Sequence, residues 1–288
     1  MSDDKTILVT GASSGIGLAA ASQLAADGAR LILVSRDPVR GAAARDLVGQ
    51  AATGTEPVFF AADLSSQQSI RRLSAEIHDR YDRLDVLLNN AGTASRHRQL
   101  TADGLETTFA TNHLGPFLLT RLLLGLVLAA PAGRIVTTTS EQHAGRIDFG
   151  NLQGERHYSF LSAYARSKLA NILFTYELAG RLASSRITAN CFTPGPSATN
   201  FGRGAGGTMG LMSAVVRFIG RSAESGGRTA VYLATSPEVD EATGLYFFHG
   251  KAARSKPITY DQEVAARLWS ISEQLTCPAG KSTRNQWR

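Results

Sequence analysis

Tyr164 and Lys168 are separated by a spacing that suits proton transfer. Apolar residues recur at helical intervals from Ala165 to Tyr176, so this stretch is expected to form a helix with one buried face. Residues four apart on a helix lie one turn above the other on the same side. The ammonium charge then favours the ionised phenol and lowers its pKa, which makes the tyrosine a candidate proton donor and acceptor. The same spacing is also typical of a solvated helix surface.

Ser140 and Asn112 are further polar candidates. Ser140 follows a predicted strand over residues 134–139, at the end where open α/β sheets place their active sites. Its hydroxyl can hold a substrate oxygen, or it can simply form a turn. Asn112 lies four residues before Pro116, which has no N–H to donate to the Asn112 carbonyl. A kink is expected there, which either leaves this carbonyl to hold an ordered water or is a mere bend in a buried helix.

A glycine-rich turn follows the first apolar run of the chain. Residues 6–10 predict a strand, and the residues from Ala19 onward continue at helical spacing, so strand, turn and helix are expected in that order. Such a turn lets the backbone approach a pyrophosphate, and the helix N-terminus offers it free N–H groups. The predicted dinucleotide contacts here are Gly11, Ser13, Ser14, Gly15, Ile16 and Gly17.

The same turn also matches Gly-x-Ser-x-Gly, the nucleophile elbow of serine hydrolases, with Ser13 as the nucleophile. An elbow normally follows several strands that supply the oxyanion loop. Here the turn follows the first predicted strand, which disfavours that interpretation.

The choice of cofactor is expected to rest on the end of a second strand, over residues 30–35. An acid at this place accepts from the ribose hydroxyls of NAD, whereas an arginine pairs with the 2′-phosphate of NADP. Arg36 comes first, and Asp37 is placed to cap a helix that Pro38 begins. The sequence therefore predicts NADP(H), with Arg36 as a plain surface charge as the alternative.

Further strands are expected at residues 57–61, 84–88, 187–192 and 245–249, which brings the total to seven. Asp63, with Leu64 beside it, can accept from the adenine amino group or cap a turn. Asn90, Ala91 and Gly92 form a polar turn that lets the backbone pass close to a bound ribose.

The C-terminal third contains a glycine-rich stretch after Pro194 and Gly195. Together with a short apolar helix expected at 211–219, it predicts a substrate lid at about 196–222, or else a surface loop. A capping box over residues 259–262 predicts the start of a terminal helix.

Composition narrows the class of protein. The net charge is +6, but basic residues are scattered singly among acids, which argues against a nucleic-acid partner. Two cysteines and six dispersed histidines offer neither a disulfide framework nor a metal site. The N-terminus shows no signal peptide or membrane anchor, and the longest apolar run, residues 122–131, is too short to span a bilayer. A cytoplasmic protein of one domain, residues 1–288, is expected.

With these motifs in order, the chain resembles the short-chain dehydrogenases/reductases over essentially its whole length. The glycine motif of that family matches residues 10–17, its Asn-Asn-Ala-Gly matches residues 89–92, and its Pro-Gly turn matches residues 194–195. Within the family, residues 112–120 and 164–171 resemble the retinol dehydrogenase group and its carbonyl reductase relatives. The glycine-rich lid and the absence of an N-terminal anchor depart from the membrane-bound retinol dehydrogenases.

The resemblance implies a doubly wound Rossmann fold, a seven-stranded parallel sheet with helices on both faces. It also implies hydride transfer between NADP(H) and the carbonyl or alcohol of a small hydrophobic substrate, by a homodimer or homotetramer. The family's catalytic residues match Asn112, Ser140, Tyr164 and Lys168, and further cofactor contacts fall on Tyr164, Lys168, Pro194, Gly195 and Thr199.

The resemblance gives each catalytic residue a role. Tyr164 passes a proton to the substrate oxygen, and Ser140 hydrogen-bonds that oxygen. Lys168 lowers the pKa of the tyrosine and holds the nicotinamide ribose, while Asn112 anchors a relay water. Two rivals are the same site repurposed for non-redox cyclisation or dehydration, and a catalytically silent NADP-binding protein.

Overall fold

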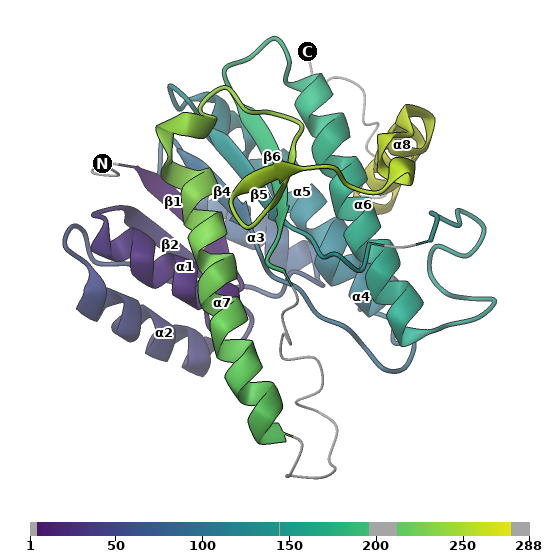
Figure 1. Cartoon of the computed structure of the whole chain (residues 1–288), viewed down its shortest axis with the longest axis horizontal. Helices are drawn as coiled ribbons and strands as arrows, with labels where there is room; N and C mark the ends of the chain where they lie inside the picture. Colours follow the sequence, from purple (N-terminus) through teal and green to yellow (C-terminus); the bar gives the residue numbers. More distant parts are fainter. Residues whose placement is uncertain (1–4, 144, 196–211, 278–288) are drawn as a thin grey trace.

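The computed structural model describes residues 5–143, 145–195 and 212–277. In these residues an eight-stranded sheet has the order β3-β2-β1-β4-β5-β6-β7-β8 (Figure 1). Its strands are β1 (Thr6–Thr10), β2 (Arg30–Ser35), β3 (Val58–Ala61), β4 (Val86–Asn89), β5 (Arg134–Thr138), β6 (Thr188–Thr193), β7 (Tyr246–Phe248) and β8 (Lys251–Ala253). The first seven run parallel, which confirms the doubly wound sheet predicted from the sequence.

The predicted count of seven strands is one short, because β8 returns antiparallel beside β7. The two strands are joined by His249 and Gly250, whose φ angles are 50° and 73°. Two successive positive φ angles are what a type I′ turn requires, and this is one of the tight two-residue turns that join the strands of β-hairpins. All three residues of β8 are exposed, so no apolar alternation marked it as a strand.

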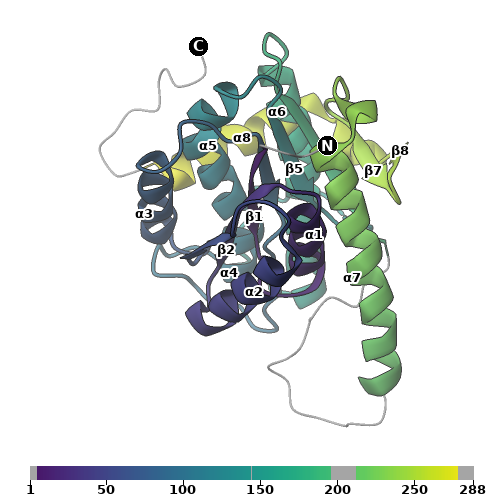
Figure 2. The same cartoon turned by 90° about the vertical axis from the view of Figure 1, so that its left-hand side faces the viewer.

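Helices cover both faces of the sheet (Figures 1 and 2). The contacts place α1, α2 and α7 together on one face and α3, α5 and α6 on the other, with α8 packed on α6. These helices are α1 (Gly15–Ala26), α2 (Pro38–Ala51), α3 (Gln67–His78), α5 (Gly115–Leu128), α6 (Phe160–Arg181), α7 (Met212–Thr235) and α8 (Gln262–Thr276).

Successive side chains of the central strands point to opposite faces of the sheet, so the hydrophobic core has two parts. Ile7 and Val9 of β1 pack toward α1 and α7, while Leu8 between them packs toward α5 and α6. All three side chains are fully buried, as expected for a parallel sheet covered on both faces. The sheet is therefore fixed from both sides, and its carboxyl edge is held in one place.

A π-helical turn lies where Pro116 predicted a kink. The short helix α4 (Thr107–Phe109) continues into η1 (Ala110–Leu114), and the Gly115 N–H donates to the Ala110 carbonyl before α5 begins. A Cβ on Gly115 would lie 2.4 Å from the Leu64 carbonyl oxygen, so only glycine allows this close approach. The turn fixes where Asn112 points.

Two helix boundaries differ from the sequence prediction. The N-cap of α8 is Asp261, whose carboxylate accepts from the Val264 N–H at 3.0 Å, and not Thr259. Thr259 belongs instead to η3 (Pro257–Tyr260), where its hydroxyl donates to the Lys256 carbonyl. The short helix expected at 211–219 is part of the longer α7. Of the predicted lid, residues 196–211 lie outside the described residues.

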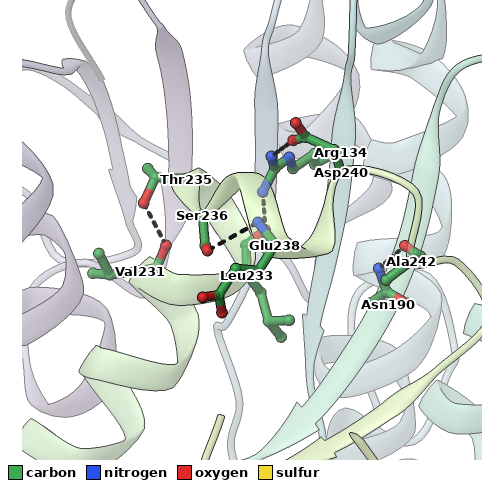
Figure 3. Close-up of polar contacts among 9 residues, drawn as sticks. All are labelled: Arg134, Asn190, Val231, Leu233, Thr235, Ser236, Glu238, Asp240 and Ala242. Carbon is green, nitrogen blue, oxygen red and sulfur yellow. Dashed lines mark hydrogen bonds and ion pairs between the residues drawn. The ribbon is translucent and has the colours of Figure 1, made fainter. Parts of the chain in front are cut away.

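The C-terminal end of α7 is anchored to the start of β5 by the polar contacts that Figure 3 shows. Arg134 is 3% exposed, and its guanidinium donates to the Leu233 carbonyl at 2.9 Å and pairs with Asp240. The side-chain amide of Asn190 in β6 holds the next segment through the Ala242 carbonyl. The short helix η2 (Pro237–Val239) lies between the two residues that Arg134 contacts, Leu233 and Asp240.

One described segment, residues 107–128, has the length and apolar composition of a membrane span. It comprises α4, η1 and α5, and 72% of its 18-residue window is buried inside the protein. The core helices of globular proteins pass the same test, and α5 packs here against α3 and β4.

Candidate active site

A cavity of about 540 Å³ opens along the carboxyl ends of β1 to β6. This volume is typical of small-molecule sites. Most of the predicted site residues line it, namely Gly11, Ser13, Ser14, Gly15, Ile16, Arg36, Asp63, Leu64, Asn90, Ala91, Gly92, Ser140, Tyr164, Lys168, Pro194 and Gly195. Gly17 and Asn112 lie behind the cavity lining, and Thr199 is outside the described residues.

The turn after β1 has the features of a phosphate cradle. Gly15 has φ of 57°, and a Cβ added there would meet nothing within 4 Å. The N-cap of α1, Ser14, makes no side-chain cap hydrogen bond, and no acidic residue lies in the first turn. The N–H groups of that turn therefore face the cavity with a positive dipole end, which fits the pyrophosphate of a dinucleotide.

Thr10 and Asn90 tie the turn to the neighbouring strand ends. The Thr10 hydroxyl accepts from the backbone N–H groups of Asn90 and Ala91 at 2.9 and 3.0 Å. The side-chain amide of Asn90 donates back to the Thr10 carbonyl and accepts from the Thr138 hydroxyl. The ends of β1, β4 and β5 are thereby held in one piece.

Two arginines line the cavity at the end of β2. The Asp37 carboxylate accepts from the N–H groups of Val39 and Arg40 at 2.9 and 3.1 Å, so it caps α2 as predicted. Arg36 and Arg40 both line the cavity and are exposed. Cations thus face the place where a dinucleotide fold selects its cofactor, while the Asp37 carboxylate beside them accepts from backbone N–H groups.

Asp63 serves the turn after β3 and lines the cavity as well. One oxygen of its carboxylate accepts from the N–H and the hydroxyl of Ser65 at 2.9 and 2.8 Å. The turn role is therefore present in the structure. The adenine contact stays a prediction, supported by the place of Asp63 and Leu64 in the cavity wall.

Tyr164 and Lys168 lie together on α6 and are 8% and 4% exposed. The Lys168 ammonium is 5.7 Å from the centre of the Tyr164 ring and donates to the Thr138 carbonyl at 3.2 Å. Burial raises the pKa of Tyr164 to about 12, against an opposing effect of the Ser140 hydroxyl. Burial also lowers the pKa of Lys168 to about 8.

The predicted downward shift of the tyrosine pKa is therefore wrong for this structure. Burial disfavours the phenolate by more than the hydrogen bond with the Ser140 hydroxyl favours it. Tyr164 holds its proton at neutral pH, and this is the form that donates to a carbonyl oxygen.

Ser140 forms the turn considered for it and also meets Tyr164, while the contact with a substrate oxygen stays a prediction. Its hydroxyl oxygen accepts from the Gln142 N–H at 3.1 Å, which is a turn-forming bond. The same hydroxyl hydrogen-bonds to Tyr164. Because Gln142 uses its acceptor side, the hydroxyl proton is left to be donated to an oxygen beside Tyr164.

Asn112 acts through its side chain as a brace. Its amide oxygen accepts from the Thr93 N–H at 2.7 Å, and its nitrogen donates to the Thr93 carbonyl and to the Ser167 hydroxyl. Ser167 in turn donates to the Tyr164 carbonyl at 2.7 Å. The fully buried Asn112 thus connects η1 with the backbone of the proposed proton donor. A water on its carbonyl stays a prediction.

No group of three or more His, Cys, Asp or Glu side chains that could hold a metal ion occurs in the described part of the chain. The candidate site consists of the glycine turn after β1 and a Ser-Tyr-Lys constellation that lines the same cavity.

The family model described as short chain dehydrogenase matches residues 5–208. The chain belongs to this family. Human retinol dehydrogenase 14 is 41% identical over 288 residues, which cover 94% of this chain and 86% of that protein. DnrU of Streptomyces sp. (strain C5), provisionally named a daunorubicin C-13 ketoreductase, is 39% identical over 272 residues. The match covers 93% of this chain and 91% of that protein.

A crystal structure from Shigella flexneri 2a, described provisionally as a short chain dehydrogenase and complexed with NADP, has a TM-score of 0.66 at 26% identity. It covers 86% of this chain and 98% of its own. The resemblance to retinol dehydrogenase-like short-chain dehydrogenases that the motifs indicated is thereby confirmed.

Four residues of this short-chain dehydrogenase site were missed by sequence reasoning: Arg40, Thr138, Ser167 and His143. Arg40 carried a usable signal, since it lies in the first turn of α2, four residues after Arg36. Ser167 stands inside the Tyr-x-x-x-Lys motif and is spaced to reach the tyrosine carbonyl. The hydrogen bond between His143 and Lys256 joins residues 113 apart in the sequence, so no local sequence pattern predicts it.

Proposed function

We propose that the protein is an NADP(H)-dependent oxidoreductase that transfers hydride between the cofactor and the carbonyl or alcohol carbon of a small hydrophobic substrate. One observation carries the proposal: Ser140, Tyr164 and Lys168 line the same cavity as the glycine turn after β1. Dinucleotide and reacting oxygen can therefore share one enclosed space.

Preference for NADP(H) over NAD(H) rests on the end of β2. Arg36 and Arg40 supply two guanidinium groups beside the cavity, and the Asp37 carboxylate is occupied by the α2 cap. A 2′-phosphate pairs well with arginine, whereas a ribose hydroxyl needs a free acceptor. The solved relative with NADP supports the same choice.

The bound dinucleotide would supply the hydride, and the chain would supply alignment and protons. The α1 N-terminus and the glycine turn would hold the pyrophosphate, and the arginines the 2′-phosphate. Ser140 donates its hydroxyl proton to the substrate oxygen, which stabilises the charge that develops there. Tyr164 then gives its phenolic proton to the same oxygen.

Lys168 and Asn112 support this proton transfer. The desolvated Lys168 ammonium lies one turn beyond Tyr164 and stabilises the tyrosinate that remains after transfer. Asn112 braces the Tyr164 backbone through Ser167. In the oxidative direction the tyrosinate takes the alcohol proton.

We propose aldehydes and ketones with an apolar body as the substrate class. This draws on the names of the relatives, one a retinol dehydrogenase and one a ketoreductase. The test adds NADPH and a panel of carbonyls, including retinal and aromatic ketones, to purified protein and follows the loss of NADPH absorbance, with Tyr164→Phe alongside. We expect the unchanged protein to oxidise NADPH with at least one of these carbonyls and Tyr164→Phe to show no such turnover. Tight NADPH binding without turnover on any carbonyl would contradict the proposal.

A further inference from the structure

His143 is a buried histidine beside the proposed site that the mechanism above does not use. It lies three residues after Ser140, is 4% exposed and is not among the residues that line the cavity. Its Nδ1 is 2.5 Å from the Ser140 carbonyl oxygen, and its Nε2 is 3.3 Å from the Lys256 backbone nitrogen. The ring also packs edge-on against Tyr246 of β7, with centroids 5.4 Å apart.

The two hydrogen-bond partners dictate the protonation state of the ring. The Ser140 carbonyl can only accept, so Nδ1 carries a hydrogen. The Lys256 backbone N–H can only donate, so Nε2 carries none. His143 is therefore a neutral imidazole in its Nδ1–H form, with both nitrogens in use.

The effect on Ser140 is direct. Its carbonyl accepts from Nδ1 of His143 and from the His143 backbone N–H at 3.3 Å. Its hydroxyl accepts from the Gln142 N–H. The serine loop is thus held against the segment between β8 and η3, and the direction of the Ser140 hydroxyl follows from that attachment. Displacements of about 1 Å at such a group can cost about a hundredfold in rate.

We propose that His143 is a positioning residue, whose neutral ring joins the Ser140 carbonyl to the Lys256 backbone and so aims the Ser140 hydroxyl at the substrate oxygen. The inference rests on the proposed carbonyl reduction for its catalytic consequence. Its structural basis, the Nδ1–H ring between two backbone groups, stands without it.

Acid should weaken this attachment. Burial lowers the pKa of His143, the Lys256 ammonium lowers it further, and the Ser140 carbonyl and the Glu141 carboxylate oppose them. The Tyr246 phenol is the titratable group facing the ring from β7. Protonation places a second N–H against the Lys256 N–H, so kcat should fall on the acid side while this ring takes up its proton.

Two substitutions separate the catalytic role from simple packing. His143→Asn keeps an amide N–H near the place of Nδ1 but cannot titrate and has no acceptor for the Lys256 N–H, whereas His143→Leu removes both bonds. We expect His143→Leu to lower kcat about ten- to hundredfold and to leave the NADPH dissociation constant within about twofold. His143→Asn, which keeps only the bond to the Ser140 carbonyl, should have a kcat between those of the unchanged protein and His143→Leu, without the acid-side fall attributed to the ring. The exposed His157→Leu is the matched control.

Three results would overturn the proposal: full kcat in His143→Leu, an equal loss in the Asn and Leu variants, or a parallel loss of NADPH affinity. A readout independent of activity is the ¹⁵N spectrum of the histidines, with amide exchange at Lys256. A neutral Nδ1–H ring, and a Lys256 amide that is protected only while His143 is present, support the attachment. An Nε2–H ring or an unprotected Lys256 amide contradicts it, even if no carbonyl is turned over.

Discussion

The two ends of the cavity are built in different ways. At the nucleotide end, the proposed pyrophosphate cradle is the local turn at 11–17, and the Asp37 carboxylate caps the N–H groups of the helix that follows it. At the catalytic end, polar side chains from distant parts of the chain hold one another. Asn112 bonds to Ser167, 55 residues later, and His143 bonds to Lys256, 113 residues later.

Because the two ends are built differently, they respond to different kinds of substitution. A backbone cradle needs residues that leave space, so it is sensitive to added atoms. A side-chain network needs each donor matched to an acceptor, so it is sensitive to lost atoms. Substitutions at the nucleotide end should change cofactor affinity, and those at the catalytic end should change kcat.

The largest expected effect belongs to Tyr164→Phe at the catalytic end. Removal of the phenolic proton donor should lower kcat about 10²- to 10⁴-fold. Because the ring that remains still fills its buried place, the NADPH dissociation constant should change little. Steady-state kinetics and fluorescence titration with NADPH measure the two quantities. A matching loss of NADPH affinity would show that the two ends do not separate.

His113, the residue after Asn112, offers a test of the catalytic end through the free energy of unfolding. This fully buried ring bonds to Ser272 of α8, and burial lowers its pKa to about 4. The unfolded chain takes up this proton near pH 6.5, so the stability due to the neutral ring is complete above that pH and falls as the pH drops toward 4. The loss should reach about 3 kcal/mol.

Urea unfolding at a series of pH values measures this loss. His113→Leu, which fills the place among Phe109 and Phe117 without titrating, should have a shallower acid slope. The exposed His157→Leu should keep the full slope. Equal slopes in His113→Leu and the unchanged protein would contradict the assignment.

Gly17→Ala tests the cradle by adding one atom. The new Cβ would lie 2.4 Å from the Gly11 carbonyl oxygen and 2.5 Å from the Asn90 amide nitrogen, so the turn must shift. We expect a loss of about 1–3 kcal/mol in stability together with weaker NADPH binding. Gly125→Ala in α5 is the matched control, since nothing lies within 4 Å of its Cβ. Unchanged NADPH affinity in Gly17→Ala would mean that the turn does not hold the cofactor.

Arg36→Ala and Arg40→Ala sharpen the nucleotide side further and carry the smallest expected effects. Each should weaken NADPH about tenfold through the loss of charge-assisted bonds and leave NADH binding unaltered. Arg45→Ala, on the exposed side of α2 and paired with Asp46, is the control. Calorimetric titration with both nucleotides gives the ratio, and an unaltered preference in both variants would remove the assignment of the 2′-phosphate.

The same contrast explains what could be predicted from sequence. β1 and β2 have the predicted bounds because apolar, β-branched runs end at clear turn residues. The glycine turn and the Asp37 cap each involve residues close together in the sequence, so their residue types are enough to predict them. Tyr164 and Lys168 meet because helical spacing alone brings them together.

What escaped prediction depends on distance or burial. β8 is short, exposed and without alternation, and it forms because a two-residue turn returns the chain to β7. The upward pKa shift of Tyr164 follows from burial that only the packed fold creates. His143 acts through the Lys256 backbone, 113 residues away, and no spacing in the sequence encodes such a partner.

The central claim is that this cavity transfers hydride from NADPH to a carbonyl carbon, with Tyr164 supplying the proton. Deuterium transfer tests it most directly: protein is mixed with NADPH deuterated at the transferable position and with a carbonyl from the panel that it turns over, and the alcohol formed is analysed by mass spectrometry. We predict one deuterium on the alcohol carbon, and no alcohol above background with Tyr164→Phe. A product that carries no deuterium, or full labelled product from Tyr164→Phe, would contradict the account.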